Sequence, residues 1–93
     1  GESYSTYKPF YEAIDSGKNL RAVVNDYMDP KKYGATKSTL SGRITDNYKE
    51  QYIEAYKRSR TEAAALKARL LNAYALLGYD RDKKSKEIDG WLK

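Results

Sequence analysis

The side chains best suited to binding chemistry lie in the segment YGATKSTLSGRIT, residues 33–45. Thr36 is a good helix N-cap, so we expect a short helix over residues 37–45 whose inner face carries Leu40 and Ile44. Basic and hydroxyl side chains on its outer face could contact phosphates and base edges in a DNA major groove. These side chains are Lys37, Ser38, Ser41 and Arg43.

Two interpretations of this helix stay open. In the first, it is the DNA-reading helix of a helix-turn-helix motif, and residues 20–28 form the supporting helix. In the second, it is a packing helix whose outer side chains are merely solvated. The connecting segment DPKKYGA is longer than the turn of about three or four residues that the motif requires, which favours the second interpretation.

Other candidate contacts are basic or aromatic. KRSR contributes Lys57, Arg58 and Arg60, and RDKKSK is a second basic run, although such runs are more often solvated faces than binding patches. The chain also has ten tyrosines, which are enriched at interfaces and can stack on unpaired bases. Most of them fall on expected inner helix faces. The exceptions, which are the better contact candidates, are Tyr4, Tyr7 and Tyr33.

Catalytic and metal-binding motifs are missing. The chain contains no Cys and no His, which removes thiol nucleophiles, disulfides, most zinc sites and the commonest general base. SGKN, beginning at Ser16, lacks the upstream glycine and the final Ser or Thr of a phosphate-binding loop. DRDKKSKEIDGW begins like a calcium loop, but lysines fill later ligand positions and Trp91 replaces the closing Glu. We therefore expect no enzymatic activity, no metal and no cofactor.

The charge of the chain indicates what kind of macromolecule it could bind. The formal net charge is +5. Residues 1–46 hold seven Lys or Arg against six Asp or Glu, and residues 47–93 hold eleven against seven. Such an excess favours acidic partners, either nucleic acid or an acidic protein face. Apolar runs such as AAAL and YALL are far too short to cross a bilayer, so we expect no membrane partner.

Helices must position these side chains. The spacing of apolar residues predicts helices over residues 7–15, 19–28, 37–45, 47–59 and 61–78. A short final helix is expected to follow DRDKKS and to bury Ile88, Trp91 and Leu92. Leu20 to Met28 forms one apolar stripe. No segment shows sustained β alternation. The prediction is a single all-α domain over residues 1–93, a small bundle of about five to six short helices.

Two of these helices raise specific expectations. Apolar residues recur every four positions from Leu40 to Tyr56, but such a row winds around a helix by about 40° per step. We therefore expect a break at Asn47, where NYKE offers a capping box. Helix 61–78, capped by Thr61 and ended by Gly78, is apolar over so broad a face that we expect it at the centre of the bundle.

Four landmarks give the chain a resemblance that covers nearly its whole length. They are the KSTL cap, the YKEQY repeat, the AYALLGYDR helix end and the ID-x-W tail. With these landmarks the chain resembles a helical segment that recurs in large uncharacterised proteins of phages and prophages from Gram-positive gut bacteria such as clostridia. The resemblance implies a phage or mobile-element origin, in a bacterial host cytoplasm or a phage particle.

The resulting functional expectation is a non-enzymatic binding module with a macromolecular partner, more readily a protein than a nucleic acid. It would act through protein–protein interaction, either as a virion component or as an inhibitor of a host protein such as a defence nuclease. The alternative is a helix-turn-helix nucleic-acid-binding protein that uses the helix at residues 36–45.

Overall fold

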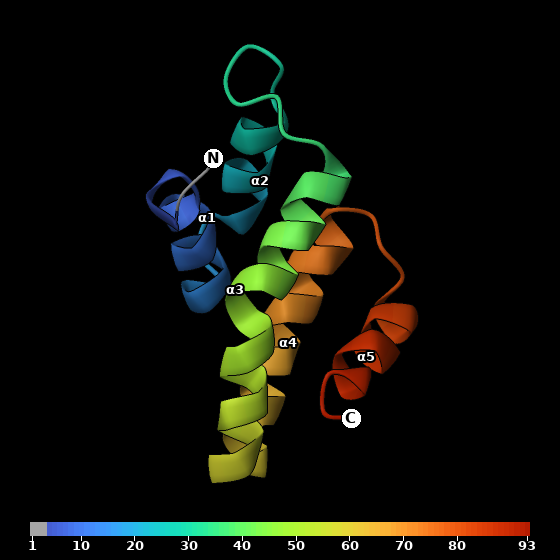
Figure 1. Ribbon diagram of the computed structural model, residues 1–93. Coiled ribbons are helices and arrows are strands. Elements are labelled where there is room, and N and C mark those ends of the chain that lie inside the picture. The colour runs from blue at the N-terminus through green and yellow to red at the C-terminus, as the bar shows by residue number, and fades with distance from the viewer. Residues whose placement is uncertain (1–3) are drawn as a thin grey trace.

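Five α-helices make up the described part of the chain, residues 4–93 of a computed structural model (Figure 1). They are α1 (Tyr4–Ser16), α2 (Leu20–Met28), α3 (Lys37–Arg58), α4 (Arg60–Leu76) and α5 (Arg81–Gly90). The two longest, α3 and α4, form an antiparallel hairpin (Figure 1). Figure 1 shows α1 and α2 on one side of this hairpin and α5 on the other. The predicted all-α bundle is confirmed.

Helix α4 is the central element, as its broad apolar surface predicts. It packs against each of the other four helices. Its buried side chains include Leu70 and Ala73, neither of which has any exposed surface. The helix ends where expected, because Gly78 adopts a φ of +96°, a left-handed conformation that is strained for residues with a side chain.

The predicted break at Asn47 is wrong, because α3 runs without interruption from Lys37 to Arg58. The row of apolar residues does wind around the helix, but it meets a different neighbour at each turn. The Tyr48 hydroxyl donates to the Asp15 carboxylate of α1 at 2.8 Å. The Tyr52 ring packs edge-on against Trp91, just beyond α5, with centroids 6.1 Å apart. A helix with neighbours on several sides buries a row that a single neighbour could not.

Three helix starts also differ from the prediction. Ser59, not Thr61, caps α4, and its hydroxyl accepts the Glu62 amide at 3.2 Å. Asp80 caps α5 through the Lys83 amide at 3.1 Å, so DRDKKS belongs to that helix rather than preceding it. Helix α1 begins at residue 4 and not at residue 7, which places Pro9 in its second turn.

The predicted apolar stripe of α2 is confirmed except at its last residue, Met28. Leu20, Val24 and Tyr27 are buried and Val23 is half-buried, whereas Met28 is 37% exposed because the chain leaves the bundle there. Among the helices of residues 4–93, none has the length and apolar character needed to cross a membrane.

Candidate functional site

The first turn of α3 presents the two most accessible of the predicted DNA contacts. Lys37 and Ser38 are exposed, and Thr36 caps the helix by accepting the Thr39 amide at 3.1 Å. The ammonium group of Lys37 lies 4.3 Å from the centroid of the Tyr79 ring, in the connection between α4 and α5. Lys37 is therefore already engaged in a cation–π contact with this connection.

The other two predicted contacts are partly covered. Ser41 is half-buried. Arg43 is half-buried as well, and its guanidinium lies 4.5 Å from the centroid of the Tyr7 ring in α1. Arg43 was expected to face outward, but it lies on the flank of α3 that packs near α1. Burial raises the pKa of the Tyr11 hydroxyl, and the charge and hydrogen bond of Arg43 oppose that rise.

The helices of the predicted motif are not arranged as a compact pair. The principal packing partners of α2 are α1 and α4. Residues 29–36 form a folded loop in which the Gly34 amide donates to the Asp29 carbonyl at 2.9 Å. The Ala35 amide then donates to the Tyr27 carbonyl at 2.7 Å. The turn from α2 into α3 is thus longer than that of a tight helix-turn-helix.

The three singled-out tyrosines have different environments. Tyr33 is 56% exposed and stacks on Tyr27, with ring centroids 4.3 Å apart. Tyr27 stacks in turn on Tyr7 at 5.4 Å. Tyr7 is buried, so its selection as a surface contact was wrong, and the side chain of Tyr4 lies outside the described residues. The rings of Tyr33, Tyr27 and Tyr7 form a column, and the Arg43 guanidinium lies at its Tyr7 end.

The KRSR segment is at the opposite end of α3 from Lys37. Lys57 pairs with Glu54 at 3.2 Å, and Arg58 pairs with Glu62 at 2.7 Å. Arg60 donates to the Tyr56 carbonyl at 2.6 Å. About twenty residues of helix separate the two ends, a distance of about 30 Å. The predicted basic contacts therefore do not form one patch.

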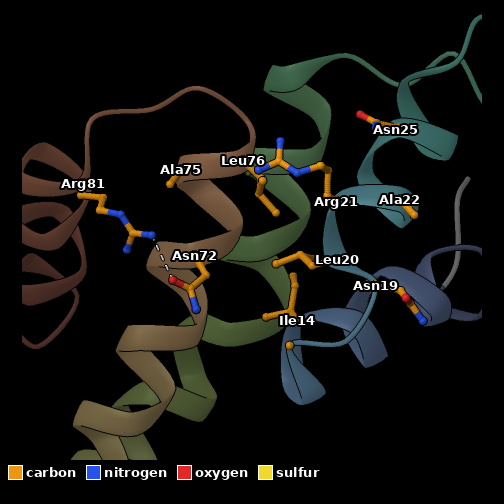
Figure 2. Close-up of a pocket in the computed structure, with 11 residues that line it drawn as sticks. Ile14, Asn19, Leu20, Arg21, Ala22, Asn25, Asn72, Ala75, Leu76 and Arg81 are labelled. Carbon is orange, nitrogen blue, oxygen red and sulfur yellow. Dashed lines mark hydrogen bonds between the residues drawn. The ribbon is translucent and has the colours of Figure 1, made fainter.

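An open groove of about 800 Å³ lies elsewhere on the surface, between the α1–α2 corner, the C-terminal half of α4 and the start of α5. Figure 2 shows the side chains that line it. They are Ile14, Gly17, Asn19, Leu20, Arg21, Ala22, Asn25, Asn72, Ala75, Leu76 and Arg81. Arg81 belongs to the basic run RDKKSK, and none of the other candidate contacts is among them.

The groove combines an apolar floor with a polar rim. Ile14 and Leu20 belong to the buried core, so the floor is fixed by the packing of the bundle. At the rim, a guanidinium nitrogen of Arg81 donates to the Asn72 amide oxygen at 3.0 Å. Figure 2 shows Arg21 extending from α2 toward α4 across the groove. Arg21 makes no ion pair with any residue from 4 to 93.

A second, smaller hollow has a different charge. It lies between α3 and α4, has a volume of about 170 Å³, and is lined by both acids and bases. Its charged residues are Asp15, Glu54, Arg58, Glu62 and Arg69. Because carboxylates face guanidiniums there, its charges are largely balanced. The larger groove is the stronger candidate for binding an external group.

The described residues do not gather metal-binding side chains. No three His, Cys, Asp or Glu residues between positions 4 and 93 are placed so that they could hold a metal ion together. Compared with protein-family models, with curated proteins and with solved structures, the chain matches none.

Proposed function

We propose that this chain is a non-enzymatic binding module of phage or mobile-element origin that binds another protein through the groove between α2, α4 and α5. The observation that supports the proposal most directly is the groove itself. It is preformed, it has an apolar floor, and its rim carries amide and guanidinium groups. Binding sites commonly combine apolar surface with a few polar groups that orient the ligand.

The energetics of such a groove suit protein binding. Ile14 and Leu20 are already buried, so the apolar surface that a partner would cover comes mainly from Ala75 and Leu76, which are half-buried. Removing that surface from water would contribute about 25 cal/mol for each Å² buried. The floor residues Ile14 and Leu20 are held by the core, so little conformational entropy is lost there when a partner binds. The resemblance to a phage segment supports a location in a virion or in the host cytoplasm, where a host protein such as a defence nuclease is a suitable partner.

The helix-turn-helix alternative has weaker support. It rests on Lys37 and Ser38, which are exposed at the capped start of α3. However, Ser41 is half-buried and Arg43 contacts Tyr7, so the remaining contacts are poorly placed for a major groove. Protein binding is the function that the geometry supports better.

A peptide-display selection on the immobilised protein tests the proposal. Ala22 lines the groove from α2 and is exposed, so Ala22→Trp should fill the groove without changing its charge. Ala64 is exposed on α4 but does not line the groove, so Ala64→Trp is the matched control. Thermal melting of both variants checks that they fold.

We expect selected peptides to bind wild type and Ala64→Trp equally, and to bind Ala22→Trp about tenfold more weakly, a loss of about 1.4 kcal/mol. A selection that enriches no peptide would contradict the proposal. So would peptides that bind Ala22→Trp as tightly as they bind wild type.

A further inference from the structure

The groove between α2, α4 and α5 is positively charged in spite of being open to solvent. Two arginines, Arg21 and Arg81, are among its lining residues, and no Asp or Glu is. Arg81 uses one guanidinium nitrogen to bond Asn72, which orients the group and leaves further N–H donors for a ligand. Arg21 has no ion-pair partner in the described chain. The groove therefore favours an anionic ligand.

The two arginines come from different walls of the groove. Arg21 is on α2 and Arg81 is at the start of α5, and Figure 2 shows Ala75 and Leu76 of α4 between them. A guanidinium binds a carboxylate through two parallel hydrogen bonds, which fixes the orientation of the ligand as well as adding energy. A ligand that satisfies both walls and the floor must carry separated negative charges with apolar groups between them.

The composition of the groove distinguishes an acidic peptide from a nucleic acid. Unpaired bases are bound by stacking on aromatic side chains, and no aromatic residue lines this groove. Its floor is aliphatic, with Leu20 and Leu76 among the lining residues. Three amide side chains, Asn19, Asn25 and Asn72, can donate to and accept from the peptide groups of a main chain. These features match a polypeptide and not a base-stacking ligand.

Building on the proposed function, we infer that the groove binds an acidic segment of a partner protein in which Asp or Glu side chains flank aliphatic ones. The carboxylates contact Arg21 and Arg81, and the aliphatic side chains cover the floor. The groove volume of about 800 Å³ fits a few side chains of one segment. The positive field at the rim also accelerates the approach of such a segment at low salt.

Three synthetic peptides test the inference by fluorescence anisotropy with the whole chain. One contains Leu and Glu, the second has Gln in place of every Glu, and the third has Lys there. We expect the Glu peptide to bind roughly tenfold tighter than the Gln peptide, and the Lys peptide to bind most weakly. The advantage of the Glu peptide should shrink as salt is added, because the paired charges lie at an exposed rim.

Charge reversal in the groove provides the reciprocal test. The double change Arg21→Glu with Arg81→Glu should invert the order, so that the Lys peptide binds best. The matched control is Lys49→Glu with Lys86→Glu, which makes the same change in net charge at exposed positions outside the groove. The control should keep the preference for the Glu peptide, and melting curves confirm that both variants fold.

Different results separate this inference from the proposed function. If the Glu and Gln peptides bind wild type equally and both are lost in Ala22→Trp, the acidic partner is wrong while peptide binding in the groove stands. If neither double variant changes the order, the two arginines do not select the peptide and the inference fails. If the control inverts the order too, net charge alone acts and the inference also fails. If none of the three peptides binds wild type, the inference fails, and the peptide-display selection decides the proposed function separately. If a single-stranded oligonucleotide displaces the Glu peptide from wild type, the choice of polypeptide is overturned.

Discussion

The Arg43 guanidinium lies 4.5 Å from the centroid of the Tyr7 ring, so the middle of α3 is tied to α1 by a cation–π contact. We predict that Arg43→Ala lowers the free energy of unfolding by about 0.5–2 kcal/mol, because the contact is half-buried. Arg43→Met, which keeps most of the stem but not the charge, should recover part of the loss. Urea denaturation measures both values. No loss in Arg43→Ala would show that the contact does not hold α1 in place.

The continuity of α3 is tested at Asn47. In an uninterrupted helix, Asn47→Ala should stabilise the protein by a few tenths of a kcal/mol, because Ala has the higher helix propensity. If Asn47 were instead the N-cap of a separate helix, the same change would cost about 1 kcal/mol. Asn47→Pro should cost about 3 kcal/mol or more within a continuous helix. Chemical denaturation of the two variants distinguishes these structures.

The central position of α4 predicts a large effect at Leu70. Its side chain is fully buried, so Leu70→Ala should lower the free energy of unfolding by about 2–5 kcal/mol. Leu71, which is half-buried on the next position of the same helix, provides the comparison, and Leu71→Ala should cost less. Equal losses in the two variants, measured by denaturation, would contradict the assigned face of α4.

The raised pKa of Tyr27 predicts that the folded protein loses stability at alkaline pH. Burial, followed by the neighbouring Tyr33, raises the pKa of Tyr27 from 10.0 to about 12. The folded state therefore holds the phenolic proton more tightly than the unfolded chain does. This contribution to stability is fully present below pH about 10 and is lost as the pH rises toward about 12.

The comparison with Tyr27→Phe isolates this contribution. The variant also loses the hydrogen bond from the Tyr27 hydroxyl to the Thr6 carbonyl, at 2.7 Å, which should cost about 0.5–1.5 kcal/mol at neutral pH. Above pH about 10, the stability of wild type should fall more steeply than that of Tyr27→Phe. Parallel pH profiles of the unfolding free energy would show that Tyr27 is not the group responsible.

Local sequence signals predicted much of the fold. The Thr36 cap, the Gly78 terminator and the wide apolar face of α4 each depend on residues close together in the chain. The Ser59 cap could also have been found, because Ser59 and Glu62 have the spacing of a capping box. The uninterrupted α3 could not be found in this way, because its winding row is buried by helices that are distant in sequence.

The candidate site was the part that sequence reasoning missed. Arg43 was placed outward because its nearest inner neighbours, Leu40 and Ile44, define only one face, whereas α1 covers the flank as well. Arg21 and Arg81 lie about sixty residues apart in the chain but line the same groove. No local sequence pattern predicts that proximity. The one local signal was the basic run RDKKSK, which contains Arg81.

The most direct test of the groove as the binding surface is a residue-by-residue map of the contact. Two-dimensional amide NMR spectra of the labelled protein would be recorded while a selected peptide is added, and separately while a DNA duplex is added. Protein binding in the groove predicts that the peptide shifts the amide signals of Ala22, Asn25, Asn72 and Ala75, and that the duplex produces only weak, salt-sensitive changes. A peptide that leaves these signals unmoved would contradict the account, as would a duplex that shifts Lys37 to Arg43 selectively at physiological salt.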